Sequence, residues 1–339
     1  MTSLGFTQWT KLIGDSGSQR GNGVVTGSDG SIYIVGNDGG NAFVSKYNSN
    51  GNLQWEKDIS SHYWNGDIEA NAISIDSDDT VYITGRDKEK VFIRKIYSDG
   101  SSGFRVDFET SGGSSFRTYD SGNAISVDSD GSIYVAGLAK GNWEGETNYG
   151  HWDAFLLKTD SNGDKLWARN LNFRVLNYKN DEAHAIDIGP DGSVYVVGDT
   201  TAGADWSGTD HDNWNAFIMK FNSDGDEIWE KVIGEGAAEY GRAVLAAQDG
   251  SIYIAYTGST TYLAKYNSSG VELWKQSYST ISYELSLTEG SDNSIYIAGS
   301  QYSNQPELDG QQPIGNGDAF ISKIDPNNGA KEWTKLIGS

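Results

Sequence analysis

The sequence predicts an all-β protein built from repeated four-stranded units, and three observations lead to this fold class. A six-residue phrase of β-branched and aromatic residues occurs six times, at spacings of 43 to 61 residues. Glycine is abundant, with 43 residues in a chain of 339, whereas there are only 4 prolines, and aromatic residues make up 12%. No segment shows a sustained 3.6-residue periodicity. This composition and pattern favour short strands joined by tight turns.

The repeated phrase is predicted to be the second strand of each unit. Asp-Gly or a close relative precedes most copies, as at Asp130-Gly131, and this dipeptide predicts a hairpin in which both turn residues have positive φ. The six copies are SIYIVG (31–36), TVYITG (80–85), SIYVAG (132–137), SVYVVG (193–198), SIYIAY (251–256) and SIYIAG (294–299).

Three further strands complete each unit. A first strand such as NAISVD (123–128) precedes the hairpin turn, and a third strand such as AFLLKT (154–159) follows the repeated phrase. After another turn comes a fourth strand, centred on an aromatic residue whose fixed place in the repeat predicts packing between adjacent units. These aromatic residues are Trp55, Phe104, Trp167, Trp229, Trp274 and Trp333.

Repeats of this length predict a β-propeller, because a single four-stranded sheet cannot bury both of its faces and its neighbours must stack around an axis. We expect one domain over residues 1–339, six-bladed with four-stranded antiparallel blades, and keep a seven-bladed propeller as the alternative. The expected blades cover residues 19–58, 69–110, 121–171, 182–233, 241–279 and 283–338.

One strand is duplicated word for word. WTKLIG occurs at residues 9–14 and again at 333–338, which gives seven fourth strands for six units. We expect the N-terminal strand, residues 7–14, to close the propeller as the outer strand of blade 6, beside residues 319–324. The Trp333 strand is then surplus, or takes that place itself. A surplus strand exposes an unpaired edge through which the chain could associate with itself.

The repeated pattern D-S-D-G-S-I-Y-V-A-G, followed by D-A-F-(I/L)-x-K-x-(D/N)-x-x-G-x-x-x-W, resembles the bacterial β-propeller repeat family named for its seven-bladed members. It is especially similar to versions in large surface or secreted proteins of cyanobacteria and other aquatic bacteria, and also to NHL-type and quinoprotein-type blades. The resemblance implies an extracellular binding or scaffolding module. It carries no shared catalytic residues.

The composition of the chain argues against several classes of binding partner. The formal net charge of −22 argues against nucleic acid and anionic membrane surfaces, since both repel an acidic protein. No apolar run approaches the roughly 18 residues of a membrane helix, so we expect no membrane insertion. The chain has no cysteine and thus no disulfide. Its first residues show no signal-peptide pattern, so we expect a cell-surface or extracellular domain without its own signal peptide.

The links between the second and third strands are long in blades 3, 4 and 6, and those of blades 3 and 4 share a pattern rich in tryptophan and acids. Exposed indole rings beside polar groups suit a glycan or peptide ligand. The carboxylates that converge in these loops suit a calcium ion instead. In a third interpretation, the tryptophans only cap the blades and the acidic side chains are solvated. The candidate ligand-binding residues are Trp143, Tyr149, His151, Trp152, Trp206, His211 and Trp214. The candidate metal ligands are Glu144, Glu146, Asp205, Asp210 and Asp212.

A second candidate site comes from the inner strands, each of which opens with one polar residue. Three of these residues, His184, Arg242 and Glu284, could place an acid/base group, a cation and a carboxylate at the mouth of the axial channel, as in a polysaccharide hydrolase or lyase. The four histidines lack zinc-site spacing, so calcium is the one cofactor considered. We favour a non-catalytic recognition or scaffolding module over this enzyme and over a structural spacer.

Overall fold

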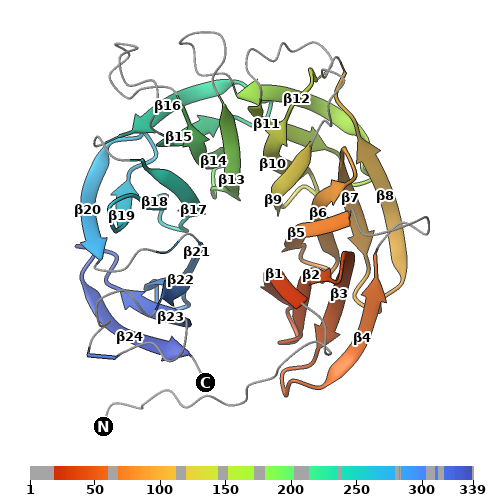
Figure 1. Ribbon diagram of the computed structural model, residues 1–339, viewed down its shortest axis with the longest axis horizontal. Helices are drawn as coiled ribbons and strands as arrows, with labels where there is room; N and C mark the ends of the chain where they lie inside the picture. Colours follow the sequence, from red (N-terminus) through yellow and green to blue (C-terminus); the bar gives the residue numbers. More distant parts are fainter. Residues whose placement is uncertain are drawn as a thin grey trace. The chain divides into compact units, whose positions relative to one another are not determined.

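The computed structural model describes residues 19–59, 68–111, 120–143, 152–171, 180–201, 214–234, 238–278, 282, 284–302, 310–311 and 317–337. Within these ranges every regular element is a β-strand, and the strands form six four-stranded sheets. The predicted class, an all-β six-bladed propeller with four-stranded antiparallel blades, is confirmed (Figure 1). None of the described residues belongs to a helix that could cross a membrane.

Each sheet is made of four strands that are consecutive in the sequence. Blades 1 to 3 consist of β1 (Gln19–Thr26), β2 (Ile32–Asp38), β3 (Asn41–Tyr47), β4 (Leu53–Asp58), β5 (Ile68–Ile75), β6 (Val81–Asp87), β7 (Lys90–Ile96), β8 (Ser102–Phe108), β9 (Ser121–Val127), β10 (Ile133–Ala139), β11 (Asp153–Thr159) and β12 (Lys165–Leu171). Blades 4 to 6 consist of β13 (Asp181–Ile188), β14 (Val194–Thr200), β15 (Asn215–Phe221), β16 (Glu227–Ile233), β17 (Tyr240–Ala246), β18 (Ile252–Thr257), β19 (Thr261–Tyr266), β20 (Glu272–Tyr278), β21 (Leu285–Glu289), β22 (Ile295–Tyr302), β23 (Gly317–Ile324) and β24 (Lys331–Ile337).

The chain forms two compact units. The first comprises Met1–Val135 and Lys158–Leu166, and the second comprises Ala136–Leu157 and Trp167–Ser339. Blades 1 and 2 belong to the first unit and blades 4, 5 and 6 to the second, while the strands of blade 3 contribute to both.

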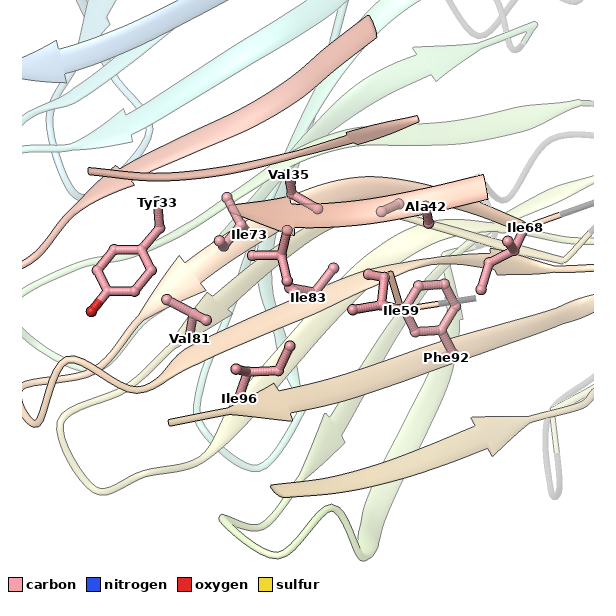
Figure 2. Close-up of a cluster of buried hydrophobic side chains, with 12 residues drawn as sticks. Tyr33, Val35, Ala42, Ile59, Ile68, Ile73, Val81, Ile83, Phe92 and Ile96 are labelled. Carbon is pink, nitrogen blue, oxygen red and sulfur yellow. The ribbon is translucent and has the colours of Figure 1, made fainter. Parts of the chain in front are cut away.

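Within each unit, apolar side chains of neighbouring blades pack together in buried clusters. In the first unit, Val35 of blade 1 packs in the same buried cluster as Ile73 and Ile83 of blade 2, and each is at most 8% exposed (Figure 2). In the second unit, Ile218 of blade 4 shares a cluster with Ile254 of blade 5. The burial of both faces of the middle strands explains why the repeated phrase is almost continuously apolar.

The turns between first and second strands differ from the expected form, in which both residues have positive φ. Gly30 has φ 77°, but Asp29 does not share this conformation; its Oδ1 accepts a hydrogen bond from the Ser31 N–H at 2.7 Å. In blades 2 and 6, Asp79 and Asn293 replace the glycine, with φ of 58° and 60°. One left-handed residue after a turn is the pattern of three-residue hairpin loops, and short polar side chains tolerate it.

The outer strand of blade 6 is β24, which contains Trp333. It pairs with β23 from Ala319 opposite Ile337 to Ile324 opposite Lys331, and β23 pairs with β22 on its other side. The expectation that the Trp9 strand takes this place is therefore wrong, because β24 already fills it. Residues 7–14 themselves lie outside the described residues.

Candidate functional site

In blades 1, 2, 4 and 5 the polar residue that opens the inner strand lies at a β-bulge. The register shifts between Gly21 and Gly23 in blade 1, and the extra residue is Asn22. The same shift occurs at Asn71, His184 and Arg242 in blades 2, 4 and 5. A bulge leaves its extra residue out of the ladder and turns its side chain away from the regular pattern.

In the first unit this bulged residue links one blade to the next. Asn22 Nδ2 donates to the Ala70 carbonyl oxygen at 2.7 Å, and Asn71 Nδ2 donates to the Gly122 carbonyl oxygen at 3.0 Å. Both acceptors belong to the inner strand of the following blade. The asparagines therefore satisfy backbone groups that the sheet leaves unpaired.

In the second unit the same position carries His184 and Arg242, and both contact the carboxylate of Asp199. His184 Nε2 lies 2.8 Å from Asp199 Oδ2, and Arg242 Nη1 lies 3.6 Å from the same oxygen. The Asp199 side chain is 6% exposed, against 19% for His184 and 17% for Arg242. A buried carboxylate flanked by an imidazole and a guanidinium is electrostatically compensated, and it ties blade 4 to blade 5.

The chemistry open to this cluster is limited by its own contacts. A carboxylate that holds an imidazole is the arrangement of a general base and its orienting group. The second ring nitrogen of His184, however, faces another carboxylate, with Nδ1 3.9 Å from Glu182 Oε1. Both nitrogens are thus directed at protein carboxylates.

Glu284, the third residue predicted for this site, belongs to blade 6. It lies exposed just before β21 in blade 6, and the contacts described above for His184 and Arg242 go to Asp199 and Glu182 instead. Of the residues predicted for a catalytic site, His184 and Arg242 thus share one partner, Asp199.

Asp199 is the member of the cluster that sequence reasoning missed. It directly follows the fourth copy of the repeated phrase, and it is the only carboxylate at that place in the repeat. The corresponding residues in the other five units are Asn37, Arg86, Leu138, Thr257 and Ser300. The sequence signal that could have identified Asp199 was a carboxylate at a position where the other five units have none.

Asp187 is a second carboxylate that the sequence analysis did not single out, and it is half-buried. It lies in β13, where its Oδ2 accepts a hydrogen bond from the Ala246 N–H of blade 5 at 2.8 Å and its Oδ1 accepts one from the Ile188 N–H at 2.9 Å. Burial raises the pKa of Asp187 to about 6, although both hydrogen bonds act to lower the pKa.

The tryptophans of the predicted ligand surface differ in exposure. Trp143 is 3% exposed and packs on Phe155 with a ring-centre distance of 5.0 Å, so it caps blade 3. Trp152 is 41% exposed, and Trp214 is half-buried. The remaining candidates lie outside the described residues: Tyr149, His151, Trp206, His211 and the acidic residues Glu144, Glu146, Asp205, Asp210 and Asp212.

Trp152 and Trp214 are fixed by equivalent backbone hydrogen bonds. The Asp181 N–H donates to the Trp152 carbonyl oxygen, and the Glu239 N–H donates to the Trp214 carbonyl oxygen, both at 2.8 Å. Trp152 also forms a parallel bridge with Asn180. Each tryptophan of one blade is thus attached to the residues that lead into the inner strand of the next.

Among the residues that the structure describes, no group of three or more His, Asp or Glu side chains could hold a metal ion. The acidic loop residues proposed as ligands fall in the ranges 144–151 and 202–213, outside the described residues.

Comparison with known proteins adds information about the fold only. No protein-family model matches the chain, and no curated protein matches it. Among solved structures, a protein from Lactobacillus plantarum is 11% identical, with a TM-score of 0.61 over 94% of this chain and 85% of that one.

Two further structures represent different activities. Virginiamycin B lyase from Staphylococcus aureus is 13% identical, with a TM-score of 0.58 over 94% of this chain and 84% of the lyase. The Pan2 WD40 domain from Neurospora crassa is 9% identical, with a TM-score of 0.54 over 95% of this chain and 79% of that one. Such low identities show a propeller scaffold and do not transfer an activity.

Proposed function

We propose that this chain is a non-catalytic recognition module that binds an uncharged glycan at the end of blades 3 and 4 where Trp152 and Trp214 lie. We further propose that it works in a surface or secreted bacterial protein of the propeller-repeat family that its repeats resemble. The observation that carries the proposal is the exposed ring of Trp152 on a fixed backbone.

An indole ring at 41% exposure offers an apolar face to the C–H side of a sugar ring. The Trp152 backbone is held at the start of β13 by a hydrogen bond from Asp181 and a β-bridge to Asn180, so the binding of a ligand orders little of the protein. Trp214 has the same attachment one blade further on. Two equivalently attached rings in adjacent units suit a ligand longer than one sugar.

Charge defines the class of glycan. A net charge of −22 disfavours sulfated or uronic-acid polymers through long-range repulsion. Neutral hydroxyl-rich chains carry no such penalty, and their hydroxyl groups can donate to the carboxylates and carbonyls of this end of the blades. The proposed ligand is therefore a neutral oligosaccharide.

The alternative is a polysaccharide hydrolase or lyase, and the observation in its favour is the 2.8 Å contact between His184 and the buried carboxylate of Asp199. Because the other ring nitrogen faces Glu182, we rank it second. An enzyme releases new chain ends from a polysaccharide and loses this activity on His184→Ala. A recognition module releases none and still binds after that substitution.

The test is a glycan array probed with the purified chain, once with calcium and once with a chelator. Binding to neutral glycans in both conditions supports recognition by the tryptophans. Binding that requires calcium supports the same role with a metal in the acidic loops. Absence of binding in both conditions contradicts glycan recognition and favours a scaffold or spacer.

A further inference from the structure

In the second unit, β24 occupies the outer edge of β23. The duplicated WTKLIG segment provides a second copy of most of the sequence of β24. Residues 333–338 provide most of β24, and residues 9–14 repeat them letter for letter. The register places Thr334 opposite Ser322 and Trp333 opposite Lys323. A strand with the same sequence can therefore be compared with β24 contact by contact.

The contacts that position β24 come from residues shared by both copies. The Trp333 ring packs against Tyr296 with a centre-to-centre distance of 6.1 Å. The hydroxyl groups of Thr334 and Ser322 lie 2.7 Å apart. The Gln311 side chain donates to the Thr334 carbonyl oxygen at 2.9 Å and accepts from the Leu336 N–H at 3.2 Å.

The flanking residues differ with little consequence. Glu332, which lies 3.3 Å from Lys323 Nζ, corresponds to Gln8 in the N-terminal copy. Lys323 keeps a second carboxylate partner, because Asp292 Oδ2 lies 3.0 Å from its Nζ. An exposed pair of this kind contributes little to docking.

The position opposite Thr334 distinguishes β23 from the third strands of blades 4 and 5. The residue that takes the place of Thr334 is Glu56 opposite Ser45 in blade 1, Glu230 opposite Met219 in blade 4 and Lys275 opposite Ala264 in blade 5. Met219 and Ala264 lack the hydroxyl partner that Thr10 would need, whereas Ser45 of blade 1 carries one. Residues 9–14 therefore fit the β23 edge better than the corresponding edges of blades 4 and 5.

We infer that residues 9–14 of one copy of this chain dock on β23 of a second copy in place of β24, so that the protein self-associates by strand exchange. Thr10 then lies opposite Ser322, and Trp9 packs on Tyr296. The exchange replaces one set of contacts with the same set, so its driving force is small and the association depends on protein concentration. This inference does not depend on glycan binding.

Disulfide trapping tests the inference directly, because the chain contains no cysteine. A Ser322→Cys chain is mixed with a Thr10→Cys chain and oxidised, and the products are identified by mass. The control replaces Thr10→Cys with Lys11→Cys, one residue out of register, whose side chain points to the opposite face of a paired strand. A Ser322→Cys/Thr334→Cys chain verifies that the register permits the bond.

We expect cross-linked heterodimers from the Thr10 mixture, in a yield that rises with protein concentration and exceeds that of the Lys11 mixture at least fivefold. Equal yields from the two mixtures overturn the inference, as does the absence of heterodimer. In a chain that carries both Ser322→Cys and Thr10→Cys, cross-links found only within single chains also overturn it, because the segment then docks on its own chain.

Discussion

The indole nitrogen of Trp229 donates a hydrogen bond to the carbonyl oxygen of Ser268, in the turn between β19 and β20 of the next blade, at 3.2 Å. Lys220 Nζ reaches the same oxygen at 3.1 Å and lies 5.2 Å from the centre of the Tyr195 ring. Trp274 and Lys265 make the same contacts with Pro326. The Tyr, Lys and Trp that recur in the repeat thus form one latch between consecutive blades.

Trp229→Phe should weaken this latch. It removes the indole N–H together with the five-membered part of the ring, so we expect the free energy of unfolding to fall by at least about 1 kcal/mol. Chemical denaturation measures the change. Ile228→Ala is the control, because Ile228 is 52% exposed and should change stability by less than about 0.5 kcal/mol. Equal effects of the two substitutions would contradict the latch.

Gly36→Ala should be severely destabilising. The glycine that ends the repeated phrase faces the bulged inner strand, and a Cβ on Gly36 would stand 2.1 Å from the Arg20 carbonyl oxygen. The backbone would have to move, and we expect a loss of more than about 3 kcal/mol or failure to fold. Its partner in the ladder, Gly21, is the control, since a Cβ there meets its nearest atom at 4.0 Å. Thermal unfolding of Gly36→Ala and Gly21→Ala should therefore differ widely.

Asp187 should make stability depend on pH between about 4 and 6. Its pKa of about 6 exceeds the ordinary carboxyl value, so the folded state binds more protons in this range and loses stability as pH rises. We expect the free energy of unfolding to fall by about 3 kcal/mol across this range. Asp187→Asn removes this dependence while it loses one acceptor oxygen, so the slope of stability with pH is the readout rather than its absolute value. An unchanged slope would show that the carboxyl group titrates normally.

The contact between Arg242 and Asp199 should show a coupling energy in a double-mutant cycle. Arg242→Met removes the guanidinium beside the buried Asp199 carboxylate, and we expect the free energy of unfolding to fall by about 1 to 3 kcal/mol. The same substitution in an Asp199→Asn background should cost clearly less. Additive losses, measured by denaturation, would contradict a shared cluster. Glycan binding should be unaffected in all three variants.

Much of the fold could be predicted because each blade repeats the same signals. The six phrases ending near Gly36, Gly85 and their counterparts fixed the number of units, and the position of Trp229 in the repeat predicted its packing between blades. Two segments have the identical sequence WTKLIG, however, and local sequence does not rank them for the edge of β23. The structure was needed to place Trp333 there.

The candidate site was less predictable because its contacts cross from one blade to another. The bulges that redirect Asn22 and His184 arise from pairing between strands, and no single strand reveals them. Asp199 meets Arg242 although 43 residues separate them in sequence. Whether an indole is exposed, as in Trp152, or folded back, as in Trp143, depends on the packing around it, and both rings lie in the same aromatic-rich segment.

The most direct test of recognition through Trp152 is the affinity of the wild-type chain and of Trp152→Ala for the neutral glycan that binds best on the array, measured by isothermal titration calorimetry. Trp333→Ala is the matched control, since Trp333 is 38% exposed and lies on the outer strand of blade 6. Loss of one aromatic stacking surface should weaken binding at least tenfold for Trp152→Ala and leave Trp333→Ala within twofold of wild type. Equal affinities of Trp152→Ala and wild type would contradict the proposed site.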